Sequence, residues 1–123
     1  IEVRRTRRLE LALAVEAAQR RVASARAIDE LLQLANIGPA MRRDLALLGV
    51  NSVRQLARRD ADALYRALQL RTGRRQDPCV WDTFAAAIDQ ARTGQARPWW
   101  HYTPERKRRQ AAGQFPPGRR AQR

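Results

Sequence analysis

Glycines, prolines and helix-capping residues divide the middle of this chain, residues 28–94, into short helical stretches. Within each stretch the apolar residues recur at three- and four-residue spacing, which is the period of an α-helix with one buried face. Alternation of apolar and polar residues, the mark of half-buried strands, does not occur in the sequence. The pattern therefore predicts an all-α fold, a compact bundle of short helices. The expected helices span residues 28–34, 40–48, 53–58, 60–70 and 77–93.

Capping residues mark where three of these helices begin. Ser52 followed by Gln55 fits a capping box, in which both side chains accept backbone N–H groups at the helix start. Asp60 can cap the next helix through its carboxylate. Asp77 followed by Pro78 can open the last one, because Asp accepts free N–H groups and Pro fits the first helical position. These signals make the helix starts the most specific part of the prediction.

Residues 7–27 contain strong helix formers throughout. We expect them to form a separate amphipathic helix, so that residues 1–27 are an N-terminal segment of their own. Its apolar stripe is narrow and rich in alanine, and consists of Leu11, Val15, Ala18, Val22 and Ala25. Such a stripe can lie on the helical domain as an extra layer, or pair with the same helix of a second copy to form a homodimer. The sequence leaves both arrangements open.

The helical pattern fails after Gly94. Residues 97–102, Arg-Pro-Trp-Trp-His-Tyr, are expected to be an extended aromatic segment, and residues 103–105 can start one more short helix. Residues 104–123 carry seven Lys or Arg against one Glu, and Pro and Gly are frequent near their end. We therefore expect a basic, largely disordered tail over residues 104–123.

The formal net charge of the chain is +13, from 25 Lys and Arg against 12 Asp and Glu. A surface this basic favours a polyanion through phosphate neutralisation and counterion release, so nucleic acid, DNA before RNA, is the first expected partner. Residues 28–103 contribute only +3 of this charge, and the two ends contribute the rest. The alternative is genome composition, because Lys107 is the only lysine and a GC-rich genome encodes Arg and Ala without selection for binding.

Cys79 is the only cysteine and His101 the only histidine. They cannot form an internal disulfide or a four-ligand zinc site, so we expect no metal, no cofactor and a reducing, cytoplasmic location. No apolar run approaches the roughly 20 residues that span a bilayer, and no membrane association is expected. Because the chain begins with Ile1 rather than Met, we expect its true start to be missing.

Residues 32–45, LQLANIGPAMRRDL, have the layout of a helix-hairpin-helix element, which makes residues 28–103 a helix-hairpin-helix domain. Two apolar residues precede a tight turn of the form Gly-apolar-Gly, and a helix starts at once. Such a turn uses residues that tolerate positive φ, and its backbone N–H groups point outwards, where a phosphate oxygen binds. Ile37 is expected to fill the space between the helices. Asn36, which replaces the first glycine, is expected to carry its side chain towards the ligand.

This element predicts non-catalytic, sequence-independent binding of a nucleic-acid backbone. Arginines one turn into the second helix add charge beside the phosphate, and a second basic cluster precedes residue 77. The candidate binding residues are Asn36, Ile37, Gly38, Ala40, Arg42, Arg43, Arg71, Arg74 and Arg75. The alternative is a protein-interaction module, in which the hairpin and the helix over residues 7–27 dock a partner and the arginines are only solvated.

Three stretches carry a more specific resemblance, namely NIGPAMRRDLALLGVNSVRQLA, DPCVWDTFAAAIDQA and PWWHYT. Together they resemble the small bacterial family of pathogenicity-locus or mitomycin-resistance-like helix-hairpin-helix proteins, over residues 28–107. Residues 32–56 alone are also similar to the C-terminal domain of TfoX-type competence regulators. The family resemblance implies a helical fold and a link to DNA transactions or to resistance against drug damage. It implies no established activity.

A Cys and a His are the minimum for nucleophilic catalysis, so Cys79 and His101 support an alternative enzyme hypothesis. Cys79 is at the second position of a helix, where the helix dipole favours a thiolate, and Asp77 or Asp82 can orient the ring of His101. A lone Cys near the start of an amphipathic helix is more often a small buried residue, however, and a His between aromatics more often packs. We therefore expect no enzymatic activity.

Trp99, Trp100 and Tyr102 also have two interpretations. They can stack on unpaired bases, an interaction worth about 1–3 kcal/mol per base. They can instead fold back and close the helical core, since few aromatic residues are available elsewhere. We expect closure of the core.

Overall fold

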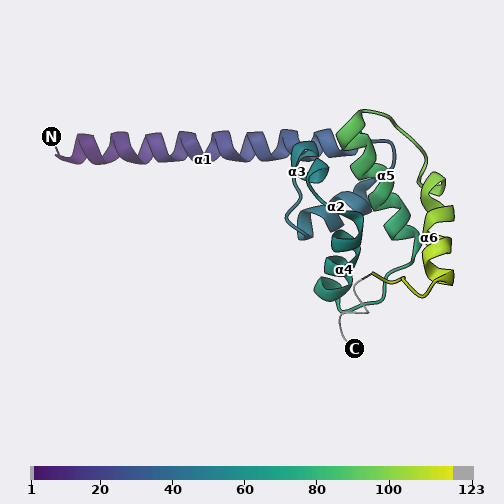
Figure 1. Ribbon diagram of the computed structural model, residues 1–123. Helices are drawn as coiled ribbons and strands as arrows, with labels where there is room; N and C mark the ends of the chain where they lie inside the picture. Colours follow the sequence, from purple (N-terminus) through teal and green to yellow (C-terminus); the bar gives the residue numbers. More distant parts are fainter. Residues whose placement is uncertain (1, 118–123) are drawn as a thin grey trace.

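Seven helices follow one another along the described part of the chain, and no strand occurs within it (Figure 1). The computed structural model describes the backbone of residues 2–117 and the side chains of residues 7–21 and 30–117. The helices are α1 Glu2–Leu32, α2 Pro39–Leu47, α3 Val53–Ala57, α4 Ala61–Thr72, α5 Cys79–Thr93, the 3₁₀ helix η1 Trp99–Tyr102 and α6 Thr103–Ala111. The prediction of an all-α fold is confirmed.

α1 is one continuous helix of 31 residues, whereas the sequence predicted two helices that meet after residue 27. The predicted break is wrong because residues 23–32 contain no Gly or Pro, and extending a helix costs less than nucleating a new one. At 1.5 Å per residue α1 is about 46 Å long. Figure 1 shows it projecting far beyond the other helices, while its C-terminal end contacts α2 and α3. No described helix, α1 included, combines the length and the apolarity that a bilayer span needs.

The hydrophobic core gathers around α5, which contacts α3, α4, α6 and η1. It contains apolar residues of α4 and α5, among them Leu64, Leu68 and Phe84, which are completely buried. Leu31 at the end of α1 also joins the core, and it anchors the long helix there. The buried members are Leu31, Ile37, Leu45, Val50, Leu56, Leu64, Tyr65, Leu68, Trp81, Phe84, Ala87 and Ile88.

The predicted helix caps form. At the start of α3 the Ser52 hydroxyl accepts the N–H of Gln55 at 3.0 Å, and the Gln55 side chain accepts the N–H of Asn51 at 2.8 Å. The glutamine thus reaches one residue further back than in a standard capping box. Asp60 caps α4 by accepting the N–H of Ala63 at 3.2 Å, and Asp77, which precedes the N-cap Pro78, accepts the N–H of Cys79 at the start of α5 at 2.8 Å. Local side-chain chemistry therefore fixes where these helices begin.

The segment after α5 packs on the core, but in a different conformation from the one predicted. Residues 97–102, expected to be extended, contain η1, and α6 follows directly. Beyond α6, Phe115 packs against Tyr65 with their ring centroids 5.2 Å apart. The prediction of a largely disordered tail is therefore wrong for residues 104–117, and residues 118–123 lie outside the described residues.

Charged side chains, rather than an apolar stripe, hold α6 against the core. Asp82 is completely buried and accepts two hydrogen bonds from Arg106, at 2.9 and 3.0 Å, and one from Thr103 at 2.7 Å. Asp62 accepts two hydrogen bonds from Arg109, at 2.8 and 2.9 Å. Both pairs are bidentate, which is the strongest geometry for Arg and a carboxylate. Because no apolar periodicity accompanies this kind of docking, the sequence pattern does not predict it.

Candidate nucleic-acid interface

The turn between α1 and α2, residues 33–38, is shaped by short-range backbone hydrogen bonds. The N–H groups of Gln33, Leu34 and Ile37 each donate to the carbonyl three residues earlier, at 3.1–3.2 Å. The Ile37 side chain is 5% exposed and belongs to the core. It is therefore unavailable to a ligand, and the turn can offer a ligand only its backbone and its polar neighbours.

The turn does not use the left-handed conformation that the sequence predicted. Gly38 has φ −97° and ψ −177°, which is extended backbone open to any residue. Among the described residues only glycines have positive φ, so Asn36 is not left-handed either. The prediction is wrong because the consecutive bonds between residues three apart reverse the chain without such a residue. The space around Gly38 is open, with no other atom within 4 Å of the position that a Cβ would take.

Three backbone N–H groups at the start of α2 have no acceptor in the described part of the chain. They belong to Gly38, Ala40 and Met41, whereas Pro39 has no N–H and the N–H of Arg42 donates to the Gly38 carbonyl at 2.9 Å. No side chain caps this helix, in contrast to α3 and α4. Free N–H groups and the positive end of the helix dipole together favour an anion at this point.

Asn36 anchors the turn to a distant segment. Its amide nitrogen donates to the Arg97 carbonyl at 2.7 Å, and its amide oxygen accepts the N–H of Trp99 at 3.1 Å. Both ends of the amide thus bind backbone, and contact of this side chain with a ligand stays a prediction. The N–H of Ala35 donates to the Gln90 side chain on α5 at 2.9 Å. The turn is thus fastened to α5 and to the segment before η1.

An open groove of about 670 Å³ lies between the turn and that segment. Residues 35–38 form one wall, and residues 96–100 form the other. The Arg97 guanidinium pairs with Asp89 on α5 at 3.5 Å, and 42% of the Arg97 side chain remains exposed. The sequence did not indicate this groove, because its two walls are about 60 residues apart in the chain and no local pattern connects them.

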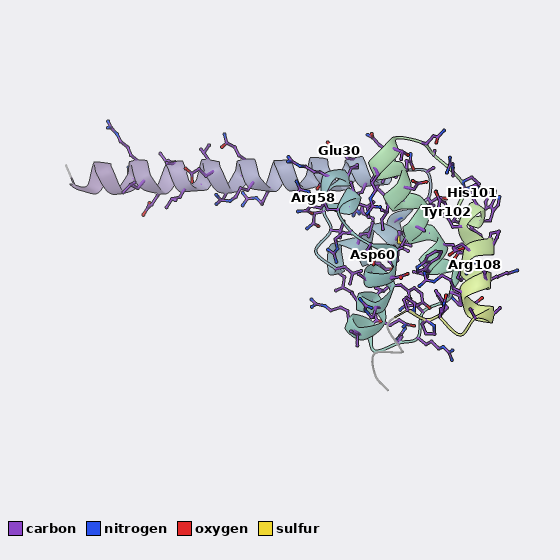
Figure 2. All side chains as sticks on the ribbon, viewed as in Figure 1. Glu30, Arg58, Asp60, His101, Tyr102 and Arg108 are labelled. Carbon is purple, nitrogen blue, oxygen red and sulfur yellow. The ribbon has the colours of Figure 1, made fainter. Side chains whose placement is uncertain are left out.

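The aromatic residues of the segment divide between core and surface. Tyr102 closes the core as predicted, since its hydroxyl donates to Asp89 and its ring packs against the buried cluster. Trp99 and Trp100 are 36% and 62% exposed, and their rings meet edge to face with centroids 5.7 Å apart. The expectation of closure is therefore wrong for Trp100. Figure 2 shows Tyr102 on the side of η1 that faces α5 and His101 on its outer side.

The predicted arginines fall into two groups. Arg42 and Arg43 follow the free N–H groups on α2, where Arg42 is half-buried and Arg43 exposed, and neither forms a salt bridge with a described residue. Arg71 lies at the other end of α2, beside Leu47 and Gly49. Because Leu47 comes eight residues after Pro39, the end of α2 beside Arg71 is about 12 Å along the helix axis from the free N–H groups at its start. The cluster of Arg71, Arg74 and Arg75 is exposed, but the fold does not bring it to the turn.

The residues that suggested an enzyme take part in structural contacts. The Cys79 sulfur accepts a hydrogen bond from Arg106 at 3.7 Å. Burial, together with a hydrogen bond and the negative charge of Asp77, raises the pKa of the Cys79 thiol above its ordinary value. The thiolate that the alternative enzyme hypothesis requires is therefore disfavoured by burial and by the Asp77 carboxylate at the start of this helix. Asp82 is bound to Arg106, and the exposed His101 packs edge to face on Tyr102.

Comparison with known proteins agrees with the resemblance. The family model described as "Pathogenicity locus" matches residues 24–108. The chain is also 46% identical over 79 residues to the mitomycin resistance protein McrB of Streptomyces lavendulae, an alignment that covers 64% of this chain and 75% of the relative. No solved structure matches the chain.

Proposed function

This chain belongs to the Pathogenicity locus family, and from that premise we propose that it is a non-catalytic protein that binds the phosphate backbone of nucleic acid, DNA in preference to RNA. The binding element is a helix-hairpin-helix formed by the end of α1, the turn over residues 33–38 and α2. The free backbone N–H groups at the start of α2 hold a phosphate, and the arginines of α2 add positive charge beside it.

One observation carries this proposal. The start of α2 presents three unpaired N–H groups on a turn that Asn36 and Gln90 hold in place, next to two arginines that lack a salt-bridge partner among the described residues. Such a site recognises phosphate and not base edges, so binding should be independent of sequence. The net charge of +13 supports it by attracting a polyanion over a longer range.

The name of the Streptomyces lavendulae relative suggests a biological role for this binding. It is named a mitomycin resistance protein, and this chain shares 46% of its residues over 79 positions. We therefore propose that the chain contributes to resistance against mitomycin, through contact with nucleic acid. The corresponding test is survival of a sensitive bacterial host on mitomycin. The unaltered chain should protect the host, and a binding-deficient variant expressed at the same level should not.

Binding is tested by fluorescence anisotropy with a labelled duplex across a salt series. Replacing Arg42 and Arg43 with Ala should weaken binding, and should reduce the slope of log affinity against log salt by about 2 if each arginine contacts one phosphate. The matched control is Arg58→Ala with Arg66→Ala, which removes the same charge from exposed positions outside α2. Equal losses in the two variants would contradict binding at α2 and indicate general attraction by net charge.

A second version of the chain, ending after Pro117, separates the fold from the terminal arginines. Truncation at this position keeps α6, whose Arg106 and Arg109 are bound to α5 and α4. It removes residues 118–123, which contain three arginines. The truncated chain should bind with the same dependence on Arg42 and Arg43. Loss of all binding on truncation would assign the attraction to the terminus and leave the hairpin without a nucleic-acid role.

A different observation favours a second candidate function, a protein-interaction module. Four large apolar residues near the free end of α1 are more than half exposed, at 54–67%. They are Leu9, Leu11, Leu13 and Val15. A helix that projects without packing is marginally stable alone, so a second copy or a partner would stabilise it. Sedimentation should then reveal a defined dimer that Leu11→Glu with Val15→Glu dissociates, and a monomer at all concentrations would argue against self-association.

A further inference from the structure

The two tryptophans beside the turn differ in environment from the third one. Trp81 is 6% exposed in the core, and its ring nitrogen donates to Asp62 at 2.7 Å. Trp100 is 62% exposed and Trp99 is 36% exposed. Keeping an indole in water forgoes the large stabilisation that its burial would supply, which makes an exposed pair a feature of binding surfaces.

The fold holds this pair in one place. Asn36 binds the backbone on both sides of Pro98, through the Arg97 carbonyl and the Trp99 N–H. Asp89 on α5 binds the Arg97 guanidinium and the Tyr102 hydroxyl, one on each side of the tryptophans. The indoles are therefore presented from a fixed segment, and binding a ligand there does not first require ordering a loop.

The groove that Trp99 and Trp100 line has the size and the charge to receive a nucleotide. Its volume of about 670 Å³ lies within the usual range of small-ligand sites. One wall carries the indoles and Arg97, and the opposite wall is the turn that ends in the free N–H group of Gly38. An aromatic face for a base thus lies across from donors for a phosphate, which is the combination used to bind single strands.

We propose that this groove takes an unpaired nucleotide, with its base stacked on Trp100 and its phosphate at the turn. The proposal rests on the proposed function and names its substrate class, single-stranded nucleic acid or the unpaired end of a duplex. A base inside an intact duplex is stacked between its neighbours, so its face is not available to an indole. The groove therefore discriminates by strandedness, whereas the free N–H groups and arginines of α2 bind any phosphate.

The experiment compares a short labelled oligothymidine with a blunt-ended duplex of the same length, using the full chain and its variants in anisotropy titrations. Trp100→Ala should weaken binding of the single strand by about tenfold or more, the usual effect of losing one stacked base, and should change duplex binding by less than about twofold. Trp100→Phe keeps an aromatic face and should retain most of the single-strand affinity. The matched control is Leu70→Ala, which removes another exposed apolar side chain, 78% exposed and on α4.

Folding and binding are measured independently, by thermal melting and by tryptophan fluorescence. Because Trp100 is largely exposed, Trp100→Ala should melt at the temperature of the unaltered chain. Oligothymidine should also quench the intrinsic tryptophan fluorescence of the unaltered chain and do so far less in Trp100→Ala, where the buried Trp81 supplies a constant background.

Two outcomes overturn the inference. Single-strand affinity that is unchanged in Trp100→Ala, with duplex binding still dependent on Arg42 and Arg43, refutes the groove and leaves the proposed function intact. If the chain binds neither oligonucleotide, both proposals are refuted, and the exposed tryptophans are then better explained as a contact for a protein partner.

Discussion

Replacing Gly38 with Asp should raise the stability of the fold and lower the affinity for DNA. The two effects have opposite signs, so one variant distinguishes folding from binding. Gly38 is the N-cap of α2, its backbone is extended, and the space around it is open, so an Asp side chain fits without strain. Its carboxylate can accept the N–H of Ala40 or Met41, as Asp does at many helix starts. It would then occupy the place proposed for a phosphate oxygen, and its charge would repel one.

The gain in stability has three sources. A better N-cap adds a few tenths of a kcal/mol, the loss of glycine freedom in the unfolded chain adds about 0.4–1 kcal/mol, and a negative charge at the positive end of the helix adds about 0.3–1 kcal/mol. Because these effects overlap, we expect a total of about 1 kcal/mol, which raises the thermal midpoint by about 3–6 °C in a chain of this size. Juxtaposed like charges cost enough to lower the affinity for DNA by at least about tenfold.

Calorimetry and anisotropy measure the two effects on the same samples. Gly38→Asn supplies a cap without the charge, so it should keep part of the added stability and lose less affinity than Gly38→Asp. Gln19→Glu adds the same charge at an exposed position on α1, and should leave both quantities unchanged. A Gly38→Asp variant that is more stable and binds DNA normally would refute phosphate binding at α2. A Gly38→Asp variant that is less stable than the unaltered chain would contradict the free N–H groups at the start of α2.

Two further predictions concern the ion pairs that dock α6. Asp82→Ala leaves Arg106 buried without its partner and should cost about 3–5 kcal/mol in urea unfolding, so a loss below about 1 kcal/mol would contradict the buried pair. Burial disfavours the Asp62 carboxylate, but hydrogen bonds from Arg109 and Trp81 outweigh it and hold the pKa of Asp62 below its ordinary value. The stability that the Asp62 carboxylate contributes is complete above the ordinary pKa of about 3.9. It is lost as the pH falls through the lower pKa that Asp62 has in the folded chain. In the Asp62→Asn variant the free energy of unfolding should therefore fall less steeply below about pH 4 than in the unaltered chain. An equally steep fall in both would contradict the role of Asp62.

The parts of the fold that could be predicted are those governed by neighbouring residues. The caps at Ser52, Asp60 and Asp77 act within three residues of themselves, so the sequence places the starts of α3, α4 and α5. The helical fold class follows from apolar spacing in the same way. The junction inside α1 could not be predicted well, because helix formers on both sides leave the choice to tertiary contacts such as the burial of Leu31.

The docking of α6 required information that the sequence does not display locally. Arg106 and Arg109 belong to a run of basic residues, and such a run is usually solvated. Their partners, Asp82 and Asp62, are 24 and 47 residues earlier in the chain. Asp82, which the enzyme hypothesis assigned to orienting the ring of His101, thus serves as the buried counter-ion of Arg106, in a helix that was expected to be disordered. Charge composition gives the number of arginines, and only the fold decides which of them pair with a carboxylate.

Asn36 shows how a departure from an expected pattern can create a site. Interpreted from the turn alone, a side chain in place of glycine obstructs a phosphate. In the folded chain its amide matches the spacing of one backbone C=O and one N–H, and it brings Arg97 and Trp99 to the turn. A glycine at this position could make neither bond, so the second wall of the groove would lose its attachment. The residue that weakens the resemblance to a simple phosphate-binding turn is therefore the one that places the tryptophans beside it, where we propose that they stack on a base.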